Sequence, residues 1–438
     1  MQALTRIIVV AFVGLAIDAA PTAARERLHE PCPANVLVEW NERVFALAIA
    51  EDGLLTLKGV RTAAMMHIAM HDAINSVRPH YVHYAYRGDG SAADPVIAAA
   101  QAAYEVMSRQ YPDQQLALER AMHKWWAGAA TDAARRRAVD VGRAAAYAIM
   151  ERRAADRWDA ELRYDFLPTG PGVYAEFPEH SGTPNGFVFG AAWAKVEPFT
   201  MTRATQFRVP PPPAITSSAY AAAYAEVKEL GRYKSRSRTA DQTHLALWWK
   251  DFAENSHNRL ARALVQAHDT DLWAAARLFA LLNMSVLDGY VAVFDAKFTF
   301  NHWRPYTAIR AADADGNAAT HAESEWTNTH RHTYPFPSYP SAHGTVCAAA
   351  MAVLADTFGS DRAFTMTTRE VASGGPQSTP MKLHPAQRSF DSFAAAAMDC
   401  ALSRVYLGIH FRYDSIAGNA LGTQIGRHAV DRYLVSTP

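Results

Sequence analysis

The stretch that decides the fold runs from residue 271 to residue 305 and reads DLWAAARLFALLNMSVLDGYVAVFDAKFTFNHWRP. Asp271 is a suitable N-cap, and the apolar residues that follow continue with few interruptions to Lys297. Arg277, Asn283 and Asp288 lie inside this run. Because such polar groups are costly in lipid, the stretch predicts a long helix buried in a protein core and not a membrane span.

The rest of the chain extends this pattern in both directions. Alanine is abundant and β-branched runs are short, which favours helices. We predict an all-α fold of two packed helical bundles: an N-terminal scaffold half, residues 25–215, and a C-terminal half, residues 216–438, that carries the functional site. Further helices are expected at residues 58–75, 92–109, 113–127, 131–154, 217–230, 240–257, 344–358, 389–408 and 411–434.

Two features refine this organisation. Residues 167–213 are rich in glycine, proline and aromatic residues and end in four prolines, so they predict an irregular connection over the surface. The last helix carries Gly418, Gly422 and Gly426 at successive i,i+4 positions, which form a smooth stripe for the close approach of another helix. Ser389 is the expected cap of the helix before it, and Gly359 the expected C-terminal cap of the helix at 344–358.

The N-terminus and the overall charge bear on location and partners. Residues 1–24 have the pattern of a cleaved signal peptide: Arg6, an apolar run at 7–17, and small residues at 19–24. We therefore expect a secreted or periplasmic protein with no membrane span after cleavage. Acidic and basic residues balance at 43 each, which argues against nucleic acid as a partner. The oligomeric state stays open.

Three clusters of polar residues late in the chain carry the chemistry. The first is Lys297, followed seven residues later by Arg304 and Pro305. The second is the tetrapeptide Pro340-Ser341-Ala342-His343, directly before an apolar helix. The third combines Ser403 and Arg404 with His410 and Asp414.

Each cluster favours binding of an anion. Lys297 and Arg304, at i,i+7, are expected on one helical face among aromatic residues, where two cations require a counter-anion. Ser341 precedes a helix whose first free N–H groups and dipole attract an anion. The i,i+4 spacing of His410 and Asp414 lets the carboxylate hold one imidazole nitrogen while the other faces outward.

With these motifs the chain resembles the superfamily of vanadium-dependent haloperoxidases and type 2 phosphatidic acid phosphatases, whose signature is K-x6-R-P, P-S-G-H and S-R-x5-H-x3-D. The first and third motifs are present in full, and Ala342 stands in the glycine position of the second. The helix at residues 67–77, with Asp72 and Asn75, also looks like that of the bacterial haloperoxidase-like branch.

The resemblance implies a role for each matching residue. Lys297, Arg304, Ser341, Arg404 and the backbone N–H of Ala342 would hold the oxygens of vanadate, or of phosphate in the same site. His410 would be the axial ligand of vanadium or, in a phosphatase, the phosphorylated nucleophile, with Asp414 orienting it. His343 would be the general acid/base, and Lys297 would polarise the peroxide without a change of metal valence.

The resemblance leaves three functions open. The leading one is a haloperoxidase that oxidises halide with hydrogen peroxide to hypohalous acid. The context of Trp303 and Phe336 favours it, since in the soluble haloperoxidases aromatic residues wall the halide side. The second is an exported acid phosphatase that hydrolyses a phosphate ester through a phosphohistidine. The third is a non-catalytic oxyanion-binding protein. The methyl group of Ala342 puts the halide and peroxide pocket in doubt.

Other candidates are interpreted structurally. His67 and His71 have a metal-like i,i+4 spacing but lack the glutamate of a zinc helix. The segment from Asp313 resembles the start of a calcium loop without its later ligands, so a plain turn is favoured. Cys347 and Cys400 are expected to be buried free thiols, with a disulfide as the alternative. His330 and His332 are candidates for the mouth of the site.

Overall fold

The computed structural model describes residues 34–52, 56–129, 131–368, 370–375 and 378–437. The predicted signal peptide, residues 1–24, lies outside them. The helices of the described residues are α1 Asn35–Asp52, α2 Leu57–Val77, α3 Pro95–Gln110, α4 Gln115–His123, α5 Asp132–Arg152, α6 Pro178–Ser181, α7 Ser218–Leu230, α8 Ala240–Trp248, α9 Ala253–Ala267, α10 Leu272–Phe300, α11 Pro305–Arg310, α12 Ala342–Phe358, α13 Phe393–Tyr406 and α14 Arg412–Arg432. Short 3-10 turns are η1 Pro112–Gln114, η2 Lys124–Gly128, η3 Trp193–Lys195 and η4 Ala312–Ala314, and the strands are β1 Phe364–Thr367, β2 Val371–Ala372, β3 Pro380–Met381 and β4 Gln387–Phe390.

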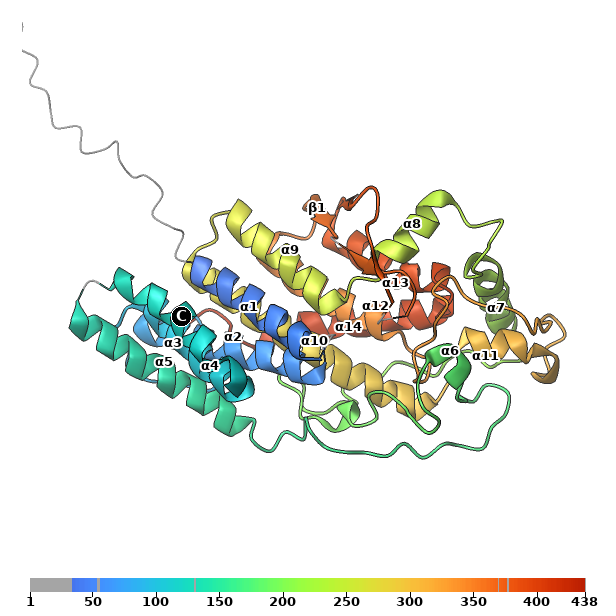
Figure 1. Ribbon diagram of the computed structural model, residues 1–438, viewed down its shortest axis with the longest axis horizontal. Helices are drawn as coiled ribbons and strands as arrows, with labels where there is room; N and C mark the ends of the chain where they lie inside the picture. The colour runs from blue at the N-terminus through green and yellow to red at the C-terminus, as the bar shows by residue number, and fades with distance from the viewer. Residues whose placement is uncertain (1–33, 53–55, 130, 369, 376–377, 438) are drawn as a thin grey trace, which may run out of the picture.

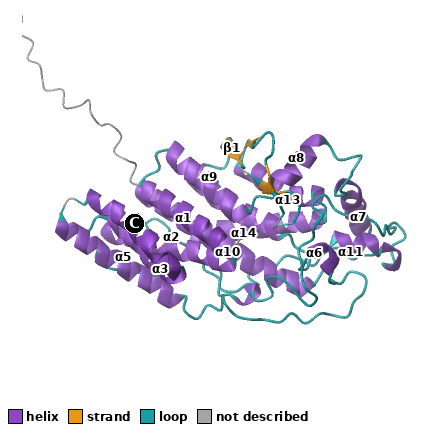
Figure 2. Cartoon of the chain, viewed as in Figure 1, coloured by secondary structure: helices purple, strands orange, loops and turns teal. Residues whose placement is uncertain are grey.

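The predicted all-α fold is confirmed. The molecule is elongated, with α3, α4 and α5 at one end, α7 and α11 at the other, and α10 along the middle (Figure 1). Helices dominate, and the strands form only two small antiparallel pairs, β1 with β4 and β2 with β3 (Figure 2). The end of the chain returns to the N-terminal helices, where the backbone N–H of Val82 donates to the carbonyl of Val435 over 2.8 Å.

Helix α10 is the central core element, as predicted. The side chain of Asp271 caps it by accepting from the backbone N–H groups of Trp273 and Ala274 at 2.9 and 3.0 Å. The helix is long and apolar enough to cross a membrane, but 94% of its most apolar window is buried inside the molecule. Its apolar surface is therefore covered by α2, α12 and the other helices packed around it.

The connection at 167–213 differs from its prediction. It is largely irregular, but it is not confined to the surface, because Tyr174, Phe177 and Phe199 are buried. Asp288 of α10 holds it through hydrogen bonds from the backbone N–H groups of Phe199 (2.6 Å) and Thr200 (2.7 Å). A buried carboxylate satisfied in this way fixes the connection against the core.

Three local predictions are wrong. The helix expected at 240–257 is two helices, α8 and α9, because the chain leaves helical conformation between Trp249 and Phe252. The cap of α13 is Ser392, whose hydroxyl accepts from Ala395 N, whereas Ser389 lies in strand β4. Third, no strand was predicted at 364–390, where the structure has β1 to β4. The Gly359 cap of α12 is confirmed.

The glycine stripe of α14 performs its predicted function. A Cβ atom built at Gly418, Gly422 or Gly426 would lie 2.4, 1.9 or 2.5 Å from the carbonyl oxygens of Ser341, Thr345 and Ala349 respectively. All three oxygens belong to the start and body of α12. The backbones of α12 and α14 are thus in direct contact, and this contact fixes the position of the α12 N-terminus relative to α14.

We expect Gly422→Ala to lower the free energy of unfolding by about 1–3 kcal/mol, because the added methyl group forces two packed helices apart. Denaturant unfolding of the purified variant measures the change. Gly128→Ala is the matched control, since a Cβ there meets nothing within 4 Å. Equal stability of the Gly422 variant and the control would show that the α12–α14 contact is looser than described.

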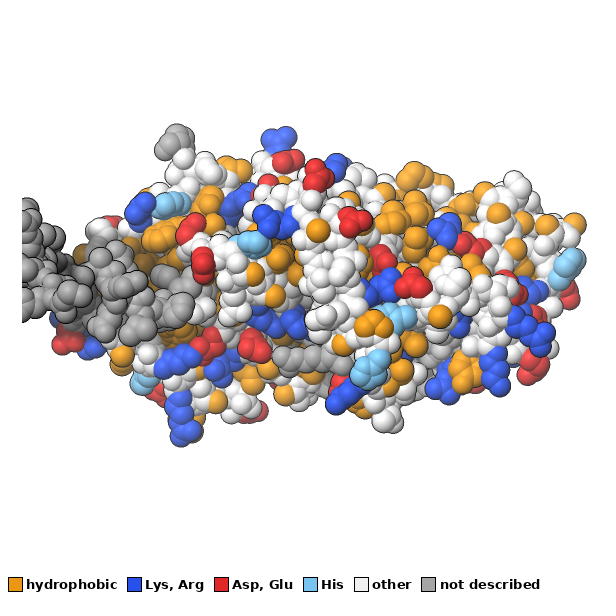
Figure 3. Space-filling model, turned by 90° about the horizontal axis from the view of Figure 1, so that it is seen from above, with side chains coloured by type: hydrophobic (Ala, Val, Ile, Leu, Met, Phe, Trp, Pro, Cys, Tyr) orange, Lys and Arg blue, Asp and Glu red, His pale blue; other side chains and the backbone are white. Residues whose placement is uncertain are grey.

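The surface carries no large area of a single charge on the face in Figure 3, where lysine, arginine and acidic side chains are interspersed. On this face the distribution agrees with the balanced composition of the chain.

Candidate oxyanion site

The first two cations meet by a turn and not along one helical face. Helix α10 ends at Phe300, Asn301 adopts a left-handed conformation with φ 49°, and Arg304 is the N-cap of α11. The predicted continuous helix is therefore wrong. Lys297 and Arg304 are nevertheless both fully buried and both contact the segment 336–338.

Backbone carbonyls hold these two side chains in place. The Nζ of Lys297 donates to the carbonyls of Pro337 and Ser338 at 2.9 and 2.7 Å. Arg304 donates from Nε to the Phe336 carbonyl at 2.8 Å and from Nη1 to the Ile409 carbonyl at 2.9 Å. The carbonyls fix both cations without neutralising their charge.

The start of α12 supplies the second cluster. Ser341 is the N-cap of the helix, and its hydroxyl accepts from the backbone N–H of Gly344 at 3.2 Å. Its own N–H donates to the carbonyl of Asp414 over 2.9 Å. This contact joins the second cluster to the third, and it places the positive end of the α12 dipole at the site.

A tight turn positions the third cluster. Arg404 lies in the last turn of α13, and Gly408 follows with φ 83°, a conformation that glycine adopts without strain. A Cβ at Gly408 would also lie 2.3 Å from the carbonyl oxygen of Gly231. The turn brings His410 back beside Arg304, whose Nη1 lies 3.1 Å from its Nε2.

Asp414 orients His410, as the spacing predicts. Its Oδ2 lies 2.9 Å from Nδ1 of His410 and also accepts from the backbone N–H of Phe411 at 3.1 Å. The hydroxyl of Ser338 donates to the same oxygen. A proton on Nδ1 shared with a carboxylate leaves the lone pair on Nε2, the nitrogen that faces Arg304. Sequence reasoning missed Ser338, although it lies only three residues before Ser341.

The electrostatics of the cluster show an excess of positive charge. Burial, and then the neighbouring Arg304, hold the pKa of Lys297 well below its usual 10.5. Burial lowers the pKa of Arg304 to about 10 and raises that of Asp414 to about 6. Burial, Arg304 and Lys297 also keep the pKa of His410 well below 6.5. Burial and the neighbouring basic groups therefore disfavour the charged forms of Lys297 and His410.

His343 lies in the first turn of α12 and lines the cavity described below. Burial, and then Arg404, hold its pKa well below 6.5, while a hydrogen bond with the Trp249 backbone opposes the shift. Its Nε2 has no hydrogen-bond partner. The carbonyl of Trp249 also accepts from Arg404 at 3.1 Å. The break between α8 and α9 therefore positions two site residues, which the sequence did not indicate.

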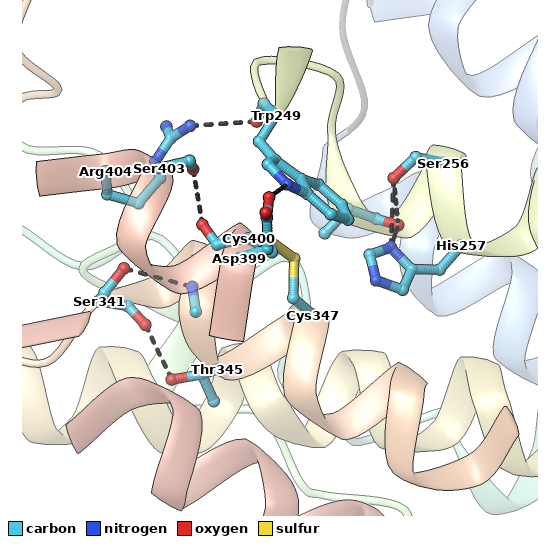
Figure 4. Close-up of a disulfide and its surroundings, with 12 residues drawn as sticks. Trp249, Ser256, His257, Ser341, Thr345, Cys347, Asp399, Cys400, Ser403 and Arg404 are labelled. Carbon is cyan, nitrogen blue, oxygen red and sulfur yellow. Dashed lines mark hydrogen bonds between the residues drawn. A yellow bond between two sulfur atoms is a disulfide. The ribbon is translucent and has the colours of Figure 1, made fainter. Parts of the chain in front are cut away.

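The prediction of free thiols is wrong: Cys347 and Cys400 form a disulfide, with their Cα atoms 6.6 Å apart. It joins α12 to α13 beside Ser341, Ser403 and Arg404 (Figure 4). A ring nitrogen of His343 and the two sulfur atoms all lie within 4.8 Å of one another. Because the sulfurs are bonded to each other, this group is a cross-link beside the site and not a metal site.

Removing the cross-link is expected to lower the free energy of unfolding by about 2–4 kcal/mol, because it closes a long loop and so restricts the unfolded chain. The two cysteines are 53 residues apart in sequence. Denaturant unfolding of the double variant Cys347→Ser/Cys400→Ser, compared with the wild type with and without reductant, measures the loss. A wild type that reductant does not destabilise, and that matches the double variant, would contradict the disulfide.

One cavity, of about 640 Å³, opens onto the cluster. His343, Arg404 and His410 line it together with Ala342 and Phe336. The methyl group of Ala342 thus faces the space that glycine would leave open.

Aromatic residues were expected to wall the site and two histidines to lie at its mouth, and these predictions are confirmed in part. Phe336 lies over the cations, 5.1 Å from Nζ of Lys297 and 4.6 Å from Cζ of Arg304. Trp303 does not line the cavity but packs in a separate core beside Tyr220. His332 reaches the cavity wall, while His330 is buried behind it.

An oxyanion such as vanadate or phosphate fits the donors that remain. Nη2 of Arg304, Nε of Arg404 and Nε2 of His343 are buried without a hydrogen-bond partner. Two guanidinium N–H groups without acceptors are costly inside a protein, and oxygens of a tetrahedral anion satisfy such groups. The nitrogen lone pair of His410 is a suitable ligand for a metal centre within the anion.

The remaining candidates have structural roles. His67 lies 2.9 Å from Asn41 and stacks on Phe279, and His71 pairs with Asp72. Asp313 accepts from the backbone N–H of Ala322, and the neighbouring Asp315 carboxylate accepts from Asn317 and Thr320, which is the predicted plain turn.

Comparisons with known proteins agree with the motifs. Residues 277–436 match the family described as the VCPO second helical-bundle domain. Vanadium chloroperoxidase of Curvularia inaequalis is 27% identical over 176 residues, which are 32% of this chain and 28% of that protein. The chain thus aligns with less than a third of that relative's length.

Solved structures extend the likeness to the whole fold. The first bacterial vanadium-dependent iodoperoxidase superposes with a TM-score of 0.75 and 22% identity, covering 92% of this chain and 98% of that one. A holo-type bacterial vanadium-dependent chloroperoxidase gives a TM-score of 0.65 and 19% identity, covering 84% and 90%. The chain has the helical-bundle fold of the bacterial vanadium haloperoxidases. The resemblance predicted from its motifs is confirmed.

Removing one cation should weaken anion binding. We expect Arg304→Ala to reduce the affinity for vanadate and for phosphate by roughly tenfold or more, because a desolvated anion loses a charged partner. Arg310→Ala, at the opposite end of α11 where the side chain donates to the Trp326 carbonyl, is the control. Calorimetric titration of both variants measures the effect, and unchanged affinity in Arg304→Ala would place Arg304 outside the site.

Proposed function

We propose that this protein is a vanadate-dependent haloperoxidase that oxidises halide with hydrogen peroxide to hypohalous acid. The observation that carries the proposal is that Arg404 and His410 line one cavity, with Arg304 and Lys297 buried behind them, and that both arginines have a buried guanidinium N–H group without an acceptor. The bacterial iodoperoxidase and chloroperoxidase that share the fold support the same reaction class.

Some of these residues would bind the anion, and another would transfer protons. Arg304 and Arg404 would bind the anion's oxygens, and Lys297 would add a third charge. Asp414 keeps the proton of His410 on Nδ1, so that the lone pair of Nε2, which lies 3.1 Å from Nη1 of Arg304, would act as the ligand. Bound vanadate would supply a Lewis-acidic centre that activates peroxide toward halide. His343 has an unpartnered Nε2 at the cavity wall, and we assign it the acceptance and return of a proton there.

The residues that line the cavity indicate where the halide would bind. Phe336 lines the cavity, and its ring lies over Lys297 and Arg304. Its apolar surface lowers the polarity beside these side chains, and electrostatic interactions are stronger there than in water. We assign the halide to the space beside Phe336 and Ala342.

We also propose that the protein works outside the cytoplasm. The signal-like pattern of residues 1–24 supports export. The Cys347–Cys400 disulfide supports it independently, since such bonds persist in oxidising compartments. Cell fractionation of the full-length chain, with a variant lacking residues 2–24 as control, tests the proposal; a wild type retained in the cytoplasm would contradict it.

A paired assay tests the enzymatic proposal. The purified protein is assayed with vanadate, peroxide and, in turn, iodide, bromide and chloride. The same protein without vanadate and peroxide is assayed for hydrolysis of p-nitrophenyl phosphate. We expect halide oxidation that requires vanadate. Excess phosphate should suppress it, because both anions compete for one site, the cradle formed by Lys297, Arg304, Arg404 and His410.

The other outcomes are equally informative. Ester hydrolysis without halide oxidation would replace the proposal with the acid phosphatase acting through His410. Vanadate binding with neither activity would identify a non-catalytic oxyanion-binding protein.

A further inference from the structure

The disulfide belongs to a group of three side chains that can bind a metal. A ring nitrogen of His343 and the sulfur atoms of Cys347 and Cys400 lie within 4.8 Å of one another. His343 and Cys347 are four residues apart on α12, so they lie on the same face of that helix, and Cys400 reaches them from α13 (Figure 4). In the oxidised protein the two sulfurs are bonded to each other. In the reduced protein the same group offers two thiols and an imidazole.

Two thiolates and one imidazole form a ligand set that suits zinc. Zinc binds cysteine sulfur and histidine nitrogen in a tetrahedral arrangement, and thiolates select it over the harder magnesium and calcium ions. A site with two cysteines and one histidine leaves the fourth position to water or another ligand. Two packed helices, α12 and α13, therefore supply all the protein ligands that such a site requires.

The charges around the group are compatible with a buried cation. Cys347 and Cys400 are fully buried in the core, where an unbalanced charge is costly. Two thiolates balance the charge of one zinc ion, so the metal centre would be neutral overall. Arg404 lies one helical turn after Cys400 on α13, and a nearby positive charge favours the thiolate over the thiol.

The histidine of the group is in the form that binds metal. Burial, and then Arg404 and His257, hold the pKa of His343 well below 6.5, so its ring is neutral and carries a lone pair. His257, labelled near the disulfide in Figure 4, has a buried Nε2 without a hydrogen-bond partner. His343 also lines the cavity, which supplies an entry path for an ion.

We propose that the reduced protein binds a zinc ion through His343, Cys347 and Cys400, at a site that the disulfide closes. A thiol reductant opens it as Cys–S–S–Cys + 2 RSH → 2 Cys–SH + RS–SR, and zinc then binds as Zn²⁺ + 2 Cys–SH + His → Zn(Cys–S)₂(His) + 2 H⁺. Disulfide formation and metal binding are therefore mutually exclusive. The inference does not rest on the proposed function. It bears on that function because zinc would occupy a nitrogen of His343.

Titration of the reduced protein with cobalt and zinc tests the site without any enzymatic reaction. The full-length chain, without a polyhistidine tag and with Cys32→Ser so that only the paired cysteines respond, is reduced with a phosphine in mild denaturant. It is then refolded and desalted without oxygen, and alkylation with mass spectrometry verifies that both thiols are free. We expect one Co²⁺ ion to bind per chain with the charge-transfer absorption of a cobalt–thiolate bond, and Zn²⁺ to displace it.

Matched variants assign the ligands. In the reduced protein, His343→Ala and Cys400→Ser should each weaken zinc binding by more than the roughly 10–100-fold that loss of a supporting contact typically costs. His321→Ala, which removes an exposed histidine of the same half of the chain, is the control. Thermal unfolding gives a second measurement, since zinc should raise the Tm of the reduced protein but not that of the oxidised protein or of reduced His343→Ala.

Three results would overturn the inference. The first is a reduced protein that neither binds cobalt or zinc nor gains stability from zinc. The second is equal binding by the oxidised protein, and the third is unchanged zinc affinity in reduced His343→Ala. Because vanadate, peroxide and halide are all absent, each of these results leaves the proposed function standing. Failure of the halide oxidation assay, in turn, leaves the zinc site standing.

Discussion

Replacing His410 with alanine is expected to abolish tight binding of vanadate, to weaken binding of phosphate, and to stop any turnover on either anion. His410 presents Nε2 to the cradle because Asp414 holds Nδ1 at 2.9 Å. Both proposed chemistries, ligation of vanadium and formation of a phosphohistidine, use this nitrogen. The loss of vanadate affinity should be on the order of 100-fold or more, comparable to breaking a buried charged pair.

Calorimetry with vanadate and with phosphate measures the change. His321→Ala removes an exposed histidine of the same half of the chain and serves as the control. The ratio of the two losses carries further information. Vanadate should lose more affinity than phosphate, because phosphate interacts with the cations alone until it is transferred to the histidine. Near-normal vanadate affinity in the variant would show that the ligand is a different residue.

The site could be predicted because each motif fixes its own local geometry. Ser341 directly precedes an apolar helix, so it had to lie at a helix N-terminus, and the i,i+4 spacing of His410 and Asp414 had to bring the two side chains together. The single helical face expected for Lys297 and Arg304 was wrong, because the left-handed conformation of Asn301 ends α10 between them. The two cations converge nevertheless, since both are held by the segment at 336–338.

The residues that were missed act through long-range packing. Trp249 lies at the break between α8 and α9, which the apolar pattern did not reveal, and its carbonyl accepts a hydrogen bond from Arg404, 155 residues further along the chain. Cys347 and Cys400 were expected to be free thiols, with a disulfide as the alternative, and the distance between two packed helices decides between them. No local pattern encodes such contacts, because they depend on how the helices are arranged.

The glycine stripe shows how a sequence signal for packing also determines the site. Gly418 lets α14 lie against Ser341, and the carbonyl of Asp414 accepts from the N–H of the same serine. Helix α14, which carries Asp414 and directly follows His410, is thereby held against the N-terminus of α12. The disulfide adds Arg404 to this unit by joining α12 to α13. The cradle is therefore preformed by backbone contacts and one covalent bond, which limits the reorganisation needed when an anion binds.

His343→Ala is expected to separate binding from turnover. The imidazole lies in the first turn of α12 with Nε2 free at the cavity wall, and no hydrogen bond joins it to Lys297 or Arg304 among the described residues. Vanadate affinity should therefore stay within about tenfold of the wild type. The rate of halide oxidation per bound vanadate should fall by about 10²–10⁴-fold, the typical contribution of a general acid or base.

Asp414→Ala provides the contrast with His343→Ala. It disturbs the proposed vanadate ligand, His410, whereas His343→Ala removes the proposed general acid/base. Without the carboxylate, Nδ1 of His410 loses its partner, and neither the ring orientation nor the lone pair on Nε2 is maintained. Loss of such a supporting contact typically costs about 10–100-fold in metal affinity, so this variant should lose both affinity and rate. Affinity is measured by calorimetry and the rate at saturating vanadate. If His343→Ala instead loses affinity as severely as His410→Ala while keeping a normal rate per bound vanadate, then His343 is a ligand. The acid/base would then be sought at His332, which lines the same cavity.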